Sequence, residues 1–251
     1  PVYNETSLVG SGHFDGGTSG AIANSTTAGL QDTSGNSNNG AASNANGTGM
    51  AWTAGKADGA VIFDGVDDKV TVGDKSSLKG FNTVTAMAWV KVNAQQMGGV
   101  LANSSGGYNF YYNSVSGIRT EIVVTGSIGV SFYGGTLPTG VWKHIAMTYD
   151  QQNLRLYIDG IQVNAVAEIR ALLAQDANGF RIGDYAGYFN GAIDEVRIYN
   201  SALSAGEIAS HYEAKTKLNY ADIRFTGNSG TELPYWMEKD GTFWIKTAGS
   251  N

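Results

Sequence analysis

Loops rich in aspartate, asparagine and glycine are the segments of this sequence best suited to chemistry. Residues 32–40 offer the carboxylate of Asp32, the amide of Asn36 and the backbone carbonyls of residues 38–40. Ca²⁺ takes about six to eight such oxygens from flexible loops. The pattern predicts a calcium site, whereas the alternative is a turn-rich loop without an ion. The three aspartates of the loop Asp64–Asp68 are a second candidate, for which we favour a purely structural turn.

Tyrosines in polar stretches suit a different chemistry. Tyr108 and Tyr111 lie in a segment rich in glycine and asparagine, and Tyr185 and Tyr188 precede the last strand-like run. Exposed aromatic rings stack on the apolar face of a sugar, while amides and carboxylates bind its hydroxyl groups. These four tyrosines are therefore the predicted ligand-binding residues. The alternative is that they are core or hairpin residues.

Patterns typical of catalysis are missing from the sequence. Retaining glycoside hydrolysis needs two carboxyl groups about 5 Å apart, and no Glu-x-Asp-x-Glu strand is present to supply them. No nucleophile elbow and no phosphate-binding loop occurs. The three histidines are far apart and lack metal-ligand spacing: His13, His144 and His211. We therefore expect that the chain is not an enzyme.

Composition sets the outer limits. The 251 residues include 35 glycines and no cysteine, and 42% of them are hydrophobic, which is enough for a sizeable core. The net charge of −6 argues against nucleic acid or an anionic membrane surface as the partner. No apolar run reaches the ~18 to 20 residues of a membrane span. Thiol catalysis, zinc–thiolate sites and disulfides are excluded.

Short β-prone runs must position these loops and rings. Runs of β-branched and aromatic residues separated by Gly, Asn and Asp predict strands over 61–63, 69–72, 84–92, 118–124, 128–133, 144–149, 154–158, 161–163, 180–183 and 192–199. The run 84–92 is apolar on both faces, which predicts burial on both. The pair Asp159-Gly160 provides the positive φ angles of a two-residue hairpin turn.

One short helix is expected near the end of this pattern. Ser204 and Glu207 form a capping box, and Ile208 with Tyr212 supplies an apolar stripe. Ten or more short strands with one closing helix predict an all-β fold, an antiparallel two-sheet β-sandwich.

Four sequence blocks, in this order, resemble the laminin-G-like, concanavalin A-like jelly-roll family. The blocks are Asp32–Gly40, Gly59–Asp68, Trp142–Asp150 and Phe189–Tyr199. Together they span roughly Leu8 to Ala214, so we expect the jelly roll over residues 1–214. The family usually carries Trp or Tyr before the Phe-Asp pair of its first strand, where this chain has His13.

The resemblance implies an extracellular or cell-surface protein that binds glycans or proteins and often holds structural calcium. On the same ground Asp194, at a position where related folds place a calcium ligand, and Asp15, beside the first strand, join Asp32 and Asn36 as predicted metal ligands. The leading hypothesis is a non-catalytic, glycan-binding recognition module. The alternatives are a structural subunit of a surface assembly, such as a filament, adhesin or viral fibre, and, less favoured, a glycoside hydrolase.

The tail, residues 215–251, has a different character. It resembles part of a small β domain of unknown function that accompanies laminin-G-like domains in bacterial and archaeal surface proteins. Its few strand-like runs cannot enclose their large rings, the predicted assembly residues Tyr235, Trp236, Phe243 and Trp244. We therefore predict self-assembly or completion of a split domain through pairing with an outside strand. The alternative is that the tail adds an edge strand to its own jelly roll.

Overall fold

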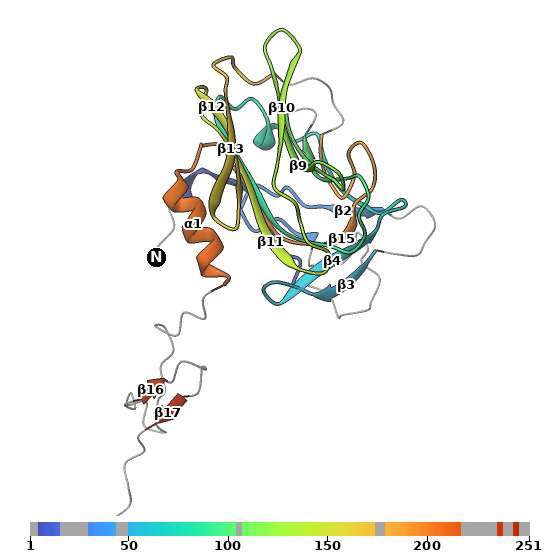
Figure 1. Ribbon diagram of the computed structural model, residues 1–251, viewed down its shortest axis with the longest axis vertical. Coiled ribbons are helices and arrows are strands. Elements are labelled where there is room, and N and C mark those ends of the chain that lie inside the picture. The colour runs from blue at the N-terminus through green and yellow to red at the C-terminus, as the bar shows by residue number, and fades with distance from the viewer. Residues whose placement is uncertain are drawn as a thin grey trace, which may run out of the picture. The chain divides into compact units, whose positions relative to one another are not determined.

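The computed structural model describes residues 5–15, 30–43, 50–103, 107–173, 179–216, 235–237 and 243–245. The chain divides into two compact units, Pro1–Tyr212 and Glu213–Asn251. In its described residues the first unit is a sandwich of two antiparallel sheets with one α-helix, and Figure 1 shows its strands in two layers. The predicted all-β, two-sheet fold is therefore confirmed.

The eight-stranded sheet has the order β13-β12-β11-β6-β15-β4-β3, and β1 also pairs with β15. In chain order its strands are β1 (Leu8–Gly12), β3 (Ala51–Ala54), β4 (Gly59–Asp64), β6 (Val84–Val92), β11 (Trp142–Tyr149), β12 (Asn153–Ile158), β13 (Ile161–Ala167) and β15 (Asn190–Tyr199). The strand β15 lies between β4 and β6, so the last strand of the first unit occupies an interior position in this sheet.

The seven-stranded sheet has the order β10-β9-β8-β7-β14-β5-β2. In chain order its strands are β2 (Ala41–Ser43), β5 (Lys69–Gly73), β7 (Gly98–Asn103), β8 (Tyr108–Asn113), β9 (Gly117–Val124), β10 (Ile128–Gly134) and β14 (Phe180–Ile182). Short 3₁₀ turns occur at Glu5–Ser7 and Ser76–Leu78. Neighbours that are distant in sequence, such as β14 and β5, are typical of a jelly roll.

Strand β6 is buried on both faces, as its sequence predicts. Val84, Ala86, Ala88 and Val90 pack into the core between the sheets. Met87 packs on the opposite face, in a second cluster beneath helix α1 (Ala205–Ala214). The helix covers the outer face of the eight-stranded sheet, which explains why no polar alternation marks this strand.

The two local signals for a turn and a helix start are also confirmed. Asp159 and Gly160 have φ angles of 51° and 77°, as a two-residue hairpin between β12 and β13 requires. At the start of α1, the Ser204 amide donates to Glu207 Oε2 at 2.7 Å, and the Glu207 amide donates to Ser204 Oγ at 3.3 Å. Local chemistry therefore sets both features.

The second unit contains β16 (Tyr235–Met237) and β17 (Phe243–Ile245), which pair with each other. Trp236 lies opposite Trp244 in their antiparallel register. Pairing of this hairpin with a strand of another chain or domain stays a prediction.

Candidate functional site

Two of the predicted sugar-binding tyrosines, Tyr108 and Tyr111, lie on strand β8, and their side chains lie on opposite faces of the sheet. Tyr108 is 1% exposed, packs in the core between the sheets, and donates its hydroxyl to the Leu78 carbonyl at 3.0 Å. Burial raises its pKa, so the group stays a neutral donor. The prediction that Tyr108 binds a ligand is wrong, because a core ring cannot meet a solvent-borne sugar.

Tyr111 lies on the outward face of the seven-stranded sheet, because successive side chains of a strand alternate. The guanidinium carbon of Arg119 lies 5.0 Å from the Tyr111 ring centre and 5.8 Å from that of Tyr133. The two tyrosine rings are 6.3 Å apart and nearly perpendicular. An arginine held against two rings in this way is stabilised by cation–π attraction.

Charged and polar groups complete this arrangement. Arg119 Nη1 lies 2.9 Å from Glu121 Oε2, and Arg119 Nη2 donates to Ser131 Oγ at 2.6 Å. The Tyr185 hydroxyl donates to Glu121 Oε1 at 3.3 Å, and its ring lies 5.9 Å from that of Tyr111. We call Tyr111, Arg119, Glu121, Tyr133 and Tyr185 the tyrosine–arginine surface.

Exposure decides which of these rings a ligand can reach. Tyr111 is only 5% exposed, whereas Tyr133 is 39% exposed. Tyr111 is thus the base of the surface, not a direct contact. Tyr133 and the half-buried Tyr185 are the rings that a ligand meets. Burial raises the pKa of Tyr185, so its hydroxyl is protonated at neutral pH.

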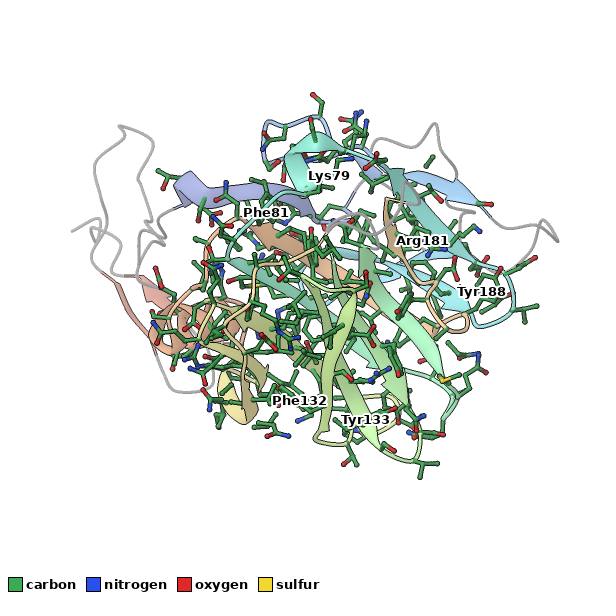
Figure 2. All side chains as sticks on the ribbon, turned by 90° about the horizontal axis from the view of Figure 1, so that it is seen from above. Lys79, Phe81, Phe132, Tyr133, Arg181 and Tyr188 are labelled. Carbon is green, nitrogen blue, oxygen red and sulfur yellow. The ribbon has the colours of Figure 1, made fainter. Side chains whose placement is uncertain are left out.

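The loop that carries Tyr185 passes very close to β7. A Cβ on Gly99 would lie 2.1 Å from the Tyr185 amide nitrogen, so only glycine permits this approach. Tyr188 is on the same loop, where its backbone forms an isolated antiparallel β-bridge with that of Asp184. Arg181 Nη1 contacts Asp184 Oδ2 at 2.9 Å, and Figure 2 shows Arg181 and Tyr188 on one side of the molecule.

Sequence reasoning missed Arg119, Glu121 and Tyr133. The signal was available in the β9–β10 hairpin, where Tyr133 pairs with Arg119 and Glu121 follows Arg119 by two residues. A period of two places Arg119 and Glu121 on one face, and pairing places Tyr133 beside them. Which face is outward depends on the packing of the two sheets.

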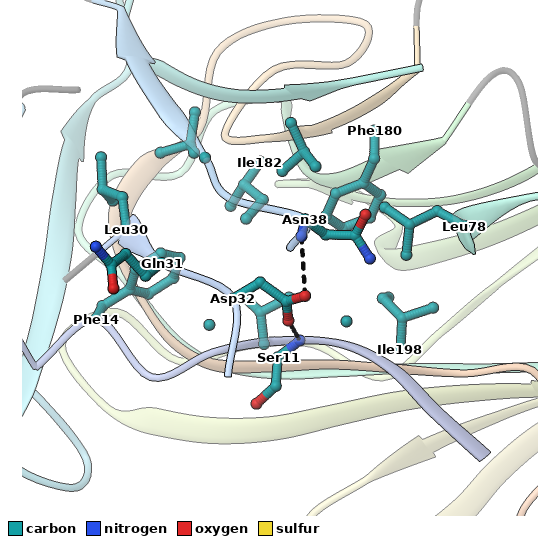
Figure 3. A pocket seen from close by; sticks show the side chains of 16 residues that line it. Ser11, Phe14, Leu30, Gln31, Asp32, Asn38, Leu78, Phe180, Ile182 and Ile198 are labelled. Atoms are coloured by element: carbon teal, nitrogen blue, oxygen red, sulfur yellow. Dashed lines mark hydrogen bonds between the residues drawn. The ribbon is translucent and has the colours of Figure 1, made fainter. Parts of the chain in front are cut away.

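Asp32, the first predicted calcium ligand, is already saturated with hydrogen bonds. Oδ1 accepts from the Ser11 and Ser34 amides at 2.8 and 3.0 Å; Oδ2 accepts from Ser34 Oγ at 2.7 Å and the Asn38 amide at 2.9 Å. Figure 3 shows Asp32 between Ser11 and Asn38, beside a largely apolar cavity of about 30 Å³. Burial opposes ionisation, but these hydrogen bonds lower the Asp32 pKa overall.

Asp194 and Asp15 brace a different turn. The fully buried Asp194 accepts from the Lys56 and Ala57 amides at 2.8 and 3.1 Å through Oδ2, and from the Glu195 amide at 2.7 Å through Oδ1. Burial raises its pKa to about 7. Asp15 Oδ1 accepts from the Gly59 amide at 3.0 Å. Both carboxylates therefore secure the β3–β4 hairpin.

The predicted four-residue calcium site is not assembled. Asn36 is exposed and donates its amide to Ser34 Oγ at 3.1 Å. Across the described ranges, Asp15, Asp32 and Asp194 belong to no group of three acids whose ligand atoms lie within 4.8 Å of one another. Backbone and hydroxyl donors use these carboxylates instead, so the structure does not bring the four residues together around one ion, and calcium binding by them stays a prediction.

The loop Asp64–Asp68 does bring three acids together. Asp64, Asp67 and Asp68 each offer a carboxylate oxygen, and these atoms lie within 4.8 Å of one another. Burial, together with the charges of Asp64 and Asp67, raises the pKa of Asp68 to about 6. The second candidate loop is thus the one in which negative charge is concentrated.

Comparisons with known proteins agree with this fold. Within the described part of the chain, no helix is long and apolar enough to cross a membrane. No curated protein matches the chain. Domain 4 of AbnA, an extracellular GH43 arabinanase from Geobacillus stearothermophilus solved in complex with arabinotriose, is similar, with 21% identity and a TM-score of 0.62 over 81% of this chain and 97% of that one.

Two toxin domains are similar as well. The botulinum neurotoxin serotype G binding domain matches with 14% identity and a TM-score of 0.63, over 97% of this chain and 63% of that one. The serotype D ligand-binding domain, in complex with N-acetylneuraminic acid, matches with 15% identity and a TM-score of 0.60, over 93% and 56%. The chain thus spans less than two thirds of these toxin domains, and identities this low show the fold alone.

A family model covers more than half of the chain. The model described as the concanavalin A-like lectin/glucanases superfamily matches residues 63–209, from the end of β4 into helix α1. This range contains the β8–β10 strands, the loop with Tyr185, and β15. The chain therefore belongs to the concanavalin A-like lectin/glucanases superfamily.

Proposed function

We propose that the chain is a non-catalytic recognition module of an extracellular or cell-surface protein, and that it binds glycans through the tyrosine–arginine surface. The observation that carries the proposal is the reachable ring of Tyr133 beside the Arg119–Glu121 ion pair. A ring provides a stacking platform for the C–H face of a sugar. The ion pair provides fixed donors and acceptors for its hydroxyl groups.

The charge of the surface favours a neutral or weakly charged sugar. Arg119 is compensated by Glu121, and Arg181 by Asp184. The whole chain carries a net charge of −6. A polyanionic glycan would therefore meet an unfavourable field. Two similar structures hold arabinotriose and N-acetylneuraminic acid, so pentose and sialylated oligosaccharides are sensible first probes.

A glycan array followed by titration calorimetry tests the proposal. Tyr133→Ala should weaken binding of any array hit roughly fivefold, whereas Tyr133→Phe should retain most of it, because the ring is kept. Ile161→Ala is a suitable control, since Ile161 is 70% exposed on β13 of the other sheet. Glycan binding that survives Tyr133→Ala and Tyr185→Ala unchanged would place the site elsewhere.

A structural subunit of a surface assembly is the second candidate, and a separate observation favours it. Strand β13 ends the order of the eight-stranded sheet, contains no charged residue, and exposes Ile161 and Val163. An uncharged end strand can recruit a strand from another molecule. Light scattering should then detect oligomers that Val163→Lys disperses. A monomer at all concentrations would exclude this role for β13.

A further inference from the structure

The loop between β4 and β5 concentrates acidic oxygen atoms in a small space. Asp64 ends β4, and Asp67 and Asp68 follow it before β5 begins at Lys69. One carboxylate oxygen from each acid lies within 4.8 Å of the other two. Three like charges this close repel one another unless a cation neutralises them.

Asp68 provides an independent sign that the loop binds a ligand. Its side chain is completely buried, and Oδ2 accepts from the Asp64 amide at 2.8 Å. Its other oxygen, Oδ1, is buried and has no hydrogen-bond partner in the described part of the chain. A buried carboxylate oxygen without a partner is costly, and a bound cation would remove that cost.

Side chains from two other segments hold the loop in shape. Asn190 Nδ2 donates to the Asp64 carbonyl at 2.6 Å, and Gln96 Nε2 donates to the Gly65 carbonyl at 2.9 Å. Gly65 has a φ angle of +82°, and a Cβ there would lie 2.3 Å from Gln96 Nε2. The acids are therefore positioned before any ligand binds.

We propose that Asp64, Asp67 and Asp68 bind one calcium ion. Every ligand atom of the group is a carboxylate oxygen, which selects hard cations over transition metals that prefer nitrogen or sulfur. Ca–O distances of about 2.3–2.6 Å let opposite ligands lie roughly 4.6–5.2 Å apart, whereas Mg–O distances of about 2.0–2.1 Å limit this separation to roughly 4.2 Å. The three oxygen atoms lie within 4.8 Å of one another, so a single calcium ion can contact all of them.

The position of the ion gives it a structural role. Gln96 Nε2 also donates to the Tyr188 carbonyl at 3.1 Å, so it links the Asp64–Asp68 loop to the loop that carries Tyr185 and Tyr188. Calcium therefore stabilises the loop of the tyrosine–arginine surface. Calcium binding itself does not depend on the proposed glycan.

Titration calorimetry on the full chain, treated with EDTA and then desalted, tests the proposal with calcium chloride as the probe. We expect about one calcium ion per chain and weaker binding of magnesium. Asp67→Asn should weaken calcium binding at least tenfold, since it removes one ligand charge from a partly exposed position. Asp58→Asn is the matched control: Asp58 is exposed, lies outside the group, and has a φ angle of 56°, which asparagine tolerates.

Three results would overturn the proposal. They are the lack of any saturable calcium heat in the wild-type chain, equal calcium affinity in Asp67→Asn and the wild type, and loss of binding in Asp32→Asn but not in Asp67→Asn. Asp68→Asn should also lose binding. Because Asp68 is buried, circular dichroism must show that this variant is folded, and Asp67→Asn decides the question if it is not.

Discussion

The loops 32–40 and Asp64–Asp68 look alike in sequence and differ in what they can bind. Both contain aspartate and glycine, yet Asp32 has four donors on its two oxygens, whereas Asp68 Oδ1 has none in the described residues. A carboxylate whose lone pairs are used by N–H and O–H groups is a structural brace. A carboxylate with an unused buried oxygen is a candidate ligand.

The tyrosines of β8 repeat this contrast. Tyr108 receives a hydrogen bond from Asn103 Nδ2 and gives one to the Leu78 carbonyl inside the core. Tyr111, three residues later, supports an open surface with Arg119 and Tyr133. Residue type therefore does not separate structural from functional groups in this molecule. What separates them is whether their hydrogen-bonding atoms are already used by partners inside the fold.

The largest expected effect on the free energy of unfolding comes from removing the Asp32 carboxylate. Asp32→Ala removes four hydrogen bonds and leaves the Ser11 and Asn38 amides without their acceptor, so the free energy of unfolding should fall by about 3 kcal/mol. Urea denaturation in EDTA and in calcium should give the same loss. A loss that appears only in calcium would mean that Asp32 binds the ion after all.

Calcium should act on the other loop. At a concentration about 100 times its Kd, an ion that binds only the folded state adds about 2.7 kcal/mol to the free energy of unfolding. Thermal denaturation should show this gain in the wild type and in Asp58→Asn, but not in Asp67→Asn. Equal stabilisation of Asp67→Asn would remove the distinction between the two loops.

The buried Asp194 should make stability depend on pH in the direction opposite to most carboxylates. Its folded pKa of about 7 lies above the unfolded value of roughly 4, so the native state holds more protons between these values, and the free energy of unfolding falls as pH rises through this window. We expect a fall of about 2 kcal/mol between about pH 5 and pH 6.5, at about 1.4 kcal/mol per pH unit, that Asp194→Asn lacks. A difference between the two proteins that does not change with pH would contradict this.

The smallest expected effects distinguish the exposed Tyr133 from the buried Tyr108. Tyr133→Ala should weaken glycan binding by about 1 kcal/mol, roughly fivefold, with little change in stability, because its ring is exposed. Tyr108→Phe should lower the free energy of unfolding by about 1 kcal/mol, because it removes a buried hydrogen bond, and should leave binding unchanged. Calorimetry and urea denaturation distinguish the two outcomes. The reverse pattern would mean that the sheet faces are misassigned.

Much of the fold follows from the sequence, since strands and turns depend on local chemistry. The Asp159-Gly160 hairpin, the Ser204–Glu207 capping box and the burial of β6 on both faces were all predictable. Each rests on residues a few positions apart or on a simple period. The family resemblance, carried by four ordered blocks, is likewise confirmed by the match over residues 63–209.

The site residues depended on contacts between distant segments. The Ser11 amide reaches Asp32 from 21 residues away, and the Lys56 amide reaches Asp194 from 138 residues away. These donors decide whether a carboxylate has lone pairs left for an ion, and no local pattern records them. The packing of one sheet on the other likewise decides that Tyr108 faces the core while Tyr133 meets solvent. Sequence determines which groups are available, and tertiary structure determines which of them are already satisfied, because hydrogen-bond partners are supplied across the fold.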